Sequence, residues 1–117
     1  MEFQELNEFK KDLKRLSKRY RSLPEDLEVL KKVIEAFPDG NPPISYPIPN
    51  LHVKTCIIKV KKIACKSLKG KGNNTGLRLI YAYLKEKEHI ILIELYHKSD
   101  QSIENRKRIT KHFKNLP

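Results

Sequence analysis

The sequence predicts an α+β fold in which an antiparallel β-sheet of three to four strands is packed by an N-terminal helical hairpin and followed by a C-terminal helix. Two observations lead to this prediction. Apolar residues recur every three or four positions in the first third of the chain, which is the spacing of a helix face. Later segments are rich in β-branched residues and are joined by short turns, which is typical of an antiparallel meander. The expected order is β-α-α-β-β-β-α in a single domain, residues 1–117.

Residues 1–37 are expected to form a short edge strand and two helices. Residues 1–6 alternate weakly in polarity and lead into Asn7, a candidate N-cap. The apolar positions of the first helix are Phe9, Leu13, Leu16 and Tyr20. Ser22 and Glu25 have the Ser-x-x-Glu spacing of a capping box, which would start the second helix. The second helix would bury Leu27, Leu30, Ile34 and Phe37 and end at the Pro-Asp-Gly of residues 38–40.

The remainder of the chain is divided by its prolines and glycines. Residues 38–51 contain five prolines, four of them within residues 41–50, and are expected to form an extended connector over the surface. Residues 52–64, 77–84 and 89–96 are predicted strands of a meander that spans 52–98. In residues 99–117, Asp100 or Ser102 would cap a helix that reaches about Lys114. The apolar positions of this helix are not spaced to form a continuous face, so we expect residues 99–117 to be partly mobile or to depend on a partner. These positions are Ile103, Ile109, Phe113 and Leu116.

Positive charge is concentrated in two parts of the chain. The 117 residues include 25 Lys and Arg against 14 Asp and Glu, a formal net charge of +11. Most of the excess lies in residues 10–21 and 51–99. A basic face of this density attracts polyanions through counterion release and electrostatic steering. Nucleic acid, an acidic protein or an anionic membrane surface would be a natural partner, and the alternative is a solvated lysine-rich surface.

Several classes of protein are disfavoured by the sequence. The longest aliphatic run, residues 90–93, is far shorter than the roughly 20 residues that span a bilayer, and the N-terminus has no apolar signal region. Cys56 and Cys65 form no C-x-x-C pair and lie at no zinc-ligand spacing. No phosphate-loop pattern precedes a helix. We therefore expect a cytoplasmic protein with no metal, no cofactor and no membrane partner.

Basic and polar residues gather where two predicted strands meet. In an antiparallel hairpin, the start of residues 77–84 lies beside the end of residues 89–96, and the glycine-rich turn of residues 67–76 enters at the same end. One site could therefore hold Arg78, Tyr96, His97, Lys98, Lys66, Lys69 and Lys71. Strict alternation puts Ile90, Leu92 and Tyr96 on one face and His97 on the other. Tyr96 and His97 can both serve one site only if the strand has ended or bulged there.

Three motifs resemble a known family. The run KSLKGKGNNTGLRLIY (66–81) is similar to the GK-x-x-G-(hydrophobic)-R-(hydrophobic)-I-Y signature of RelE/ParE-type toxins of bacterial toxin–antitoxin systems. ELYHKSD (94–100) resembles the strand-ending motif that follows it in that family, and FKKDLKRL (9–16) resembles the family's opening. The resemblance runs over nearly the whole chain.

The resemblance implies a microbial-ribonuclease-like sheet packed by two N-terminal helices. For the RelE/HigB branch it also implies an endoribonuclease that inhibits translation by cleaving messenger RNA in the ribosomal A site. The implied partners are a cognate acidic antitoxin and the ribosome, and operator DNA would be reached only through the antitoxin. The alternatives are a ParE-like non-catalytic toxin that binds DNA gyrase through its helix hairpin and C-terminal region, or an inactive toxin-like nucleic-acid-binding domain.

The candidate residues are compatible with metal-independent cleavage of RNA through its 2′-OH. Arg78 offers a planar, bidentate clamp for phosphate, and the lysines Lys66, Lys69, Lys71 and Lys98 could hold the RNA backbone. His97 has the side chain whose ordinary pKa suits proton transfer near neutrality. Tyr96 would stack on a base or donate a proton. The alternative for Arg78 is a cross-strand ion pair with Glu94.

Overall fold

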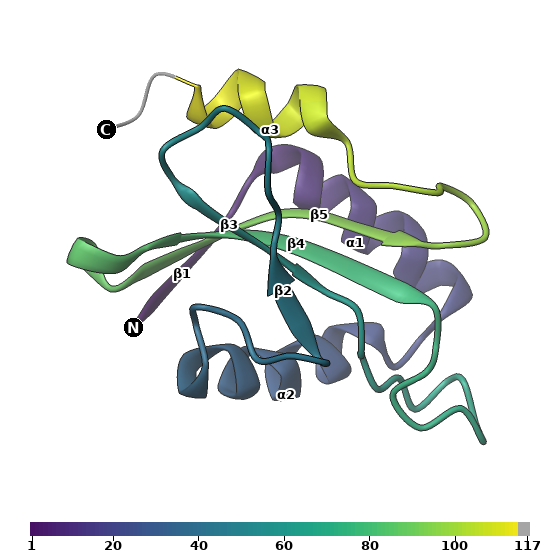
Figure 1. Cartoon of the computed structure of the whole chain (residues 1–117). Helices are drawn as coiled ribbons and strands as arrows, with labels where there is room; N and C mark the ends of the chain where they lie inside the picture. Colours follow the sequence, from purple (N-terminus) through teal and green to yellow (C-terminus); the bar gives the residue numbers. More distant parts are fainter. Residues whose placement is uncertain (115–117) are drawn as a thin grey trace.

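The structure, a computed structural model, describes residues 1–114 and has an α+β fold. Five strands form one open sheet in the order β1-β5-β4-β3-β2, and Figure 1 shows α2 and α3 on opposite sides of it. The elements are β1 (Glu2–Glu5), α1 (Asn7–Arg19), α2 (Leu23–Ala36), β2 (Ser45–Pro47), β3 (Cys56–Val60), β4 (Leu77–Leu84), the short 3₁₀ helix η1 (Lys85–Lys87), β5 (His89–His97) and α3 (Arg106–Phe113). Leu116 lies outside the described residues.

The helical hairpin covers one face of the sheet, as expected from its apolar spacing. Phe9, Leu16 and Tyr20 of the first segment are buried, together with Leu27, Leu30 and Ile34 of the second, against Val60, Leu77, Leu79 and Leu95. The prediction for Phe37 is wrong: it is the C-cap residue of α2 and is 52% exposed. A cap residue has left the helical conformation, so its side chain no longer follows the buried stripe.

The start of α1 differs from the predicted cap, whereas α2 keeps the predicted cap residue without the predicted capping bonds. α1 begins at Asn7 itself, and Leu6 occupies the N-cap position. Ser22 is the N-cap of α2, but its hydroxyl donates to Asp26 (2.7 Å) and accepts from the amide of Ser67 (2.8 Å). Ser22 therefore ties the 65–67 turn to the hairpin instead of forming the predicted capping box.

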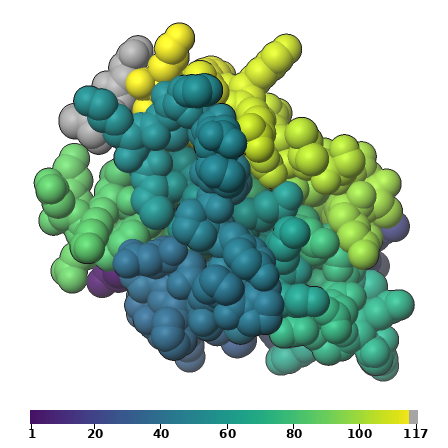
Figure 2. All heavy atoms as spheres, in the orientation of Figure 1, coloured from purple at the N-terminus to yellow at the C-terminus, as the bar shows by residue number. Residues whose placement is uncertain are grey.

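The sheet has one more strand than expected. β2 lies within the proline-rich segment, which pairs with β3 in the register Tyr46↔Lys59, and the teal-blue segment that includes it forms part of the front surface in Figure 2. β1 is an edge strand, as predicted, and it runs parallel to β5. The predicted strand 52–64 is shortened to β3, whereas β4 has the predicted bounds.

A β-bulge in β5 changes which side chains share a face. The register passes from Tyr81↔Leu92 to Ile80↔Glu94, so Ile93 is the extra residue. As a result Ile90 and Leu92 pack under the helical hairpin, whereas Tyr96 packs on the opposite face with α3. The prediction that these three residues share a face is wrong, because a bulge shifts the alternation by one residue.

α3 covers part of the second face and starts later than predicted. Its N-cap is Asn105, whose side chain accepts from the amide of Arg108 (3.0 Å), and not Asp100 or Ser102. Ile109 and Phe113 are buried against Ile57, Ile80 and Ala82, so the segment is packed on the chain's own sheet, although Ile103 stays exposed. No helix within residues 1–114 is both long enough and apolar enough to cross a bilayer.

Candidate functional site

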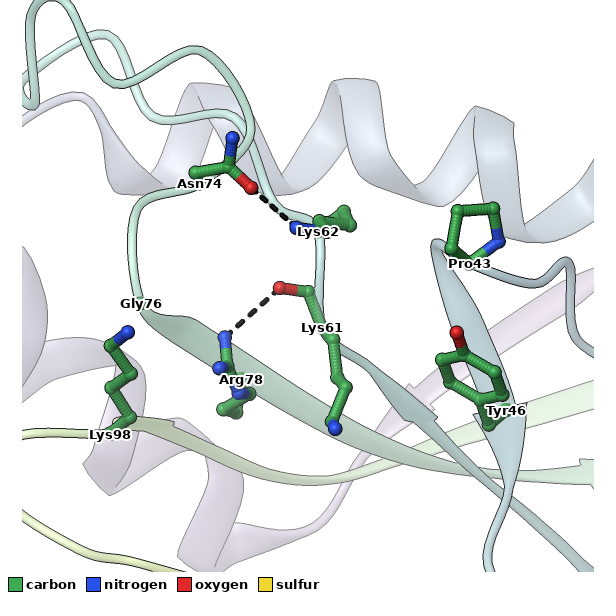
Figure 3. Close-up of a pocket in the computed structure, with 8 residues that line it drawn as sticks. All are labelled: Pro43, Tyr46, Lys61, Lys62, Asn74, Gly76, Arg78 and Lys98. Atoms are coloured by element: carbon green, nitrogen blue, oxygen red, sulfur yellow. Dashed lines mark hydrogen bonds between the residues drawn. The ribbon is translucent and has the colours of Figure 1, made fainter.

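Beyond α3, the second face of the sheet opens into a basic hollow. Ile57, Ile80 and Ala82 lie beneath the helix, but the next positions along these strands are cationic. The hollow has a volume of about 290 Å³. Figure 3 shows its lining residues, which are Pro43, Tyr46, Lys61, Lys62, Asn74, Gly76, Arg78 and Lys98. We call this feature the basic hollow.

The sheet register brings the cations of the basic hollow together. β3 and β4 pair as far as Val60↔Leu79, so one step further places Lys61 across from Arg78. Lys98 follows β5, and its amide donates to the Gly76 carbonyl (2.8 Å), which holds it at the same sheet end. The eight lining residues include four cations and no carboxylate, so the electrostatic potential of the basic hollow favours anions.

Arg78 is held by backbone carbonyls. Its Nη1 donates to the carbonyls of Lys61 (3.0 Å) and Leu77 (3.2 Å). The alternative ion pair with Glu94 is wrong, because the Glu94 carboxylate accepts from Gln101 (2.8 Å) and the Asn105 amide (2.8 Å). Both of these hydrogen bonds use Nη1, so within the described residues the other N–H groups of the guanidinium stay free for a ligand.

Tyr96 lies below the surface and does not line the basic hollow. The two strand ends lie side by side, as predicted, and Tyr96 is opposite Arg78 in the register, but only 2% of Tyr96 is exposed. Its hydroxyl has no hydrogen-bond partner within the described residues. Burial raises the pKa of this phenol, with Lys59 acting in the opposite direction. Tyr96 therefore supports the floor of the site and cannot stack on a base in this conformation.

His97 lies on the other face of the sheet, below the helical hairpin. Its Nε2 is 2.9 Å from the Thr75 carbonyl, and its Nδ1 accepts from the Ser99 amide (3.1 Å). Because a carbonyl can only accept, this network assigns the proton to Nε2. The ring also stacks on Tyr20, with centroids 6.1 Å apart. His97 thus holds the end of β5 in place and is not brought to Arg78.

The four predicted phosphate-binding lysines do not lie together. Lys98 lines the basic hollow. Lys66 lies beside α2, with its Nζ 3.7 Å from the Glu25 carboxylate, while Lys69 and Lys71 are exposed in the turn and do not line the basic hollow. Of the seven predicted residues, the structure therefore brings together Arg78 and Lys98.

Six of the eight lining residues were not among the predicted site residues, and three of these carry a charged or aromatic side chain. Lys61 and Lys62 follow β3, and Lys62 donates to the Asn74 side chain. The β3–β4 register places Lys61 beside Arg78, but the long connection between these strands does not fix that register from sequence alone. Tyr46 carried no signal either, because its strand lies among prolines, which normally argue against a strand.

Comparison with known proteins does not assign this site. A scan against models of known protein families finds no match, and a search of the curated proteins finds no similar sequence. Within residues 1–114, no three His, Cys, Asp or Glu side chains are grouped as metal ligands would be. The chemistry of the site therefore depends on its own cations.

Proposed function

We propose that the protein is the toxin of a type II toxin–antitoxin pair and acts as a ribosome-dependent endoribonuclease on translated messenger RNA. The observation that carries the proposal is the basic hollow, where Arg78, Lys61, Lys62 and Lys98 converge at one sheet end. Its Arg78 belongs to the RelE/ParE-like motif of residues 66–81. Cations that line a hollow of about 290 Å³ suit the phosphates of an RNA backbone.

In this proposal the basic hollow stabilises charge at phosphorus. The RNA 2′-oxygen attacks the adjacent phosphorus and the bond to the 5′-oxygen breaks, leaving a 2′,3′-cyclic phosphate and a 5′-hydroxyl. Arg78 clamps the phosphate oxygens, and the lysines stabilise the extra negative charge of the transition state. A lysine ammonium can protonate the leaving 5′-oxygen, and the 2′-OH proton passes to solvent. Because Tyr96 and His97 lie outside the basic hollow, acceleration comes from electrostatics and from positioning by the ribosome.

The net charge of +11 supports the proposed partners. A basic surface docks on ribosomal RNA through phosphate contacts. The cognate antitoxin would be acidic and would cover the basic hollow, so that free toxin and antitoxin-bound toxin differ in access to RNA. Operator DNA would be contacted through the antitoxin.

The test is induced expression of the protein alone, followed by primer extension on an abundant messenger with and without its start codon. The expected result is cleavage only of the translated message. Arg78→Ala should lower cleavage by about 10²- to 10³-fold, the usual cost of one oxyanion-stabilising donor. The matched control is Lys87→Ala, which removes an exposed cation from the far end of the sheet. Unchanged growth arrest in Arg78→Ala would remove Arg78 from the mechanism.

A second candidate function is a non-catalytic toxin that binds DNA gyrase. One observation favours it: Val29 and Val33 of α2 and its C-cap residue Phe37 are spaced by four residues and are 59%, 38% and 52% exposed. An apolar stripe on the helical hairpin suits a protein partner. Growth arrest with a DNA-damage response and intact messenger RNA would support this candidate over the ribonuclease.

A further inference from the structure

We propose that Tyr46 is a stacking platform for one unpaired base of a single-stranded RNA whose phosphate occupies the basic hollow. This inference rests on the proposed function, since it names the form of RNA and a residue that positions it. Tyr46 has no role in the motifs that suggested the function. Its place in the structure is what carries the inference.

Tyr46 is a half-exposed aromatic residue among cations. Its residue exposure is 38%, and the Nζ of Lys61 lies 5.9 Å from its ring centroid. Figure 3 shows its ring at one side of the basic hollow, across from Arg78. An aromatic face next to a phosphate-binding guanidinium is the arrangement with which single-stranded nucleic acid is bound, because bases stack while the backbone follows the positive charge.

The ring also stands between two hollows. Tyr46 and Lys61 line the basic hollow and a second hollow of about 370 Å³, which continues over Ile48, Lys59 and Ile103 toward the start of α3. A nucleotide can therefore place its phosphate on one side of Tyr46 and its base against the ring. A paired base is already stacked between its neighbours in a duplex, so this platform selects an unpaired one.

The platform is held in place before a ligand arrives. Its strand is short, but Tyr46 pairs with Lys59 of β3, and the Lys61 amide donates to the Ile44 carbonyl (2.9 Å). Ser45 is buried, and its hydroxyl accepts from the Asn41 amide (2.8 Å). A tyrosine on a fixed backbone loses little conformational freedom on binding, so more of its stacking free energy appears as affinity.

The experiment measures the affinity of the full chain for a fluorescein-labelled single-stranded oligoribonucleotide by anisotropy. Ribosomes are left out, so that the RNA stays intact. Tyr46→Ala and Tyr46→Leu should each weaken binding about 5- to 150-fold, whereas Tyr46→Phe should bind as the unchanged protein does. Tyr46→Leu keeps an apolar side chain on the edge strand, so it controls for loss of the strand itself; circular dichroism checks the fold of all three.

The salt dependence separates stacking from charge. Tyr46→Leu should leave the slope of log affinity against log salt unchanged, because it removes no phosphate contact. Lys98→Ala should reduce that slope by about 0.7, and Lys87→Ala should change neither the slope nor the affinity.

Three results would overturn the platform: wild-type affinity in Tyr46→Leu, stronger binding of the same sequence as a duplex, or no binding of the single strand. The ribonuclease proposal fails on a different result, namely intact translated messages on expression of the unchanged protein. Loss of RNA binding in Arg78→Ala together with unchanged binding in Tyr46→Leu would keep the basic hollow and reject the platform.

Discussion

Gly76 lines the basic hollow at a position that requires glycine. Gly76 has φ +85° and precedes β4. A Cβ on it would lie 2.7 Å from the Nε2 of His97. The backbone conformation and the lack of space both require glycine here, and His97, which was predicted to be catalytic, is the neighbour that fills the space.

Gly76→Ala is expected to destabilise the fold more than Gly70→Ala. Gly70 also has positive φ (+78°), but nothing lies within 4 Å of the Cβ it would gain. Gly70→Ala should therefore cost about 1 kcal/mol for the left-handed conformation alone. Gly76→Ala adds the clash with His97 and should cost about 3 kcal/mol. Urea unfolding of both variants measures the difference, and equal losses would contradict the role of His97.

The sequence predicts which residues are neighbours better than it predicts their orientation. The start of β4 was predicted to lie beside the end of β5 because a short charged turn joins the two strands, and this is confirmed. The direction of a side chain depends on which face of the sheet its residue occupies. Consecutive residues such as Tyr96 and His97 point to opposite faces. Burial of Tyr96 also depends on where α3 packs against the sheet. The weak apolar face of α3 does not indicate that position from the sequence.

At the element scale, an ion pair fastens α3 to α1 across the edge of β5. Asp12 is buried, and its carboxylate accepts from the Leu95 amide (3.1 Å) and from Arg108 (2.7 Å). Arg108 also donates to the Ile93 carbonyl (2.9 Å). β1 ends its pairing with β5 at Leu92, so these two side chains satisfy backbone groups that a longer β1 would otherwise bond.

Asp12→Ala is expected to lower the free energy of unfolding by about 3 kcal/mol, because it leaves a mostly buried guanidinium and an amide without their acceptor. The matched control is Asp100→Ala. Asp100 also pairs with an arginine, Arg19, at 3.5 Å, but both side chains are more than half exposed, so the cost should stay within about 1 kcal/mol. Chemical denaturation tests the pair of variants, and similar costs would contradict the role of the ion pair.

A second contact between the same helices depends on pH. The hydrogen bond from His112 lowers the pKa of Glu8 from 4.5 to about 2. A carboxyl whose pKa is lowered by folding stabilises the fold above its ordinary pKa, and the stabilisation is lost as the pH falls through about 2. Glu8→Gln should therefore lose less stability than the unchanged protein between pH 4.5 and about 2.

Urea unfolding at several pH values measures this difference. Glu86→Gln is the control, since Glu86 is exposed in η1 at the far end of the sheet. A pH profile for Glu8→Gln that coincides with that of the unchanged protein would contradict the contribution of this contact.

Local patterns predict the elements whose signal lies in their own residues. β4 has the predicted bounds because alternation and flanking turns both mark it. β2 was not predicted because it is defined by its pairing with β3, whereas its own proline-rich sequence does not favour a strand. Ser22 is the N-cap of α2, as predicted, but the capping box does not form because its hydroxyl bonds Asp26 and the Ser67 amide instead.

At the scale of the whole molecule, the excess of positive charge opposes folding. Four cations around one hollow repel each other, and a net charge of +11 adds a general repulsion. Residues kept for binding commonly reduce stability in this way.

Lys98→Gln should raise the free energy of unfolding by a few tenths of a kcal/mol to about 1 kcal/mol at low salt, and the gain should shrink as salt screens the repulsion. Lys87→Gln is the control, because Lys87 follows Glu86 and precedes Glu88. Thermal or urea unfolding at two salt concentrations measures both variants. A gain in Lys87→Gln as large as in Lys98→Gln would show that the basic hollow is no special source of repulsion.

The prolines around β2 have a consequence for self-association. An open sheet has two edge strands, and exposed edges can join other chains into aggregates. Pro43, Pro47 and Pro49 have no N–H, and Pro47 lies within β2 itself. The β2 edge therefore offers an incomplete row of donors to a second chain. Added strands, whether from a partner or from another copy, are directed to the β1 edge, so that fibre-like growth through both edges is blocked.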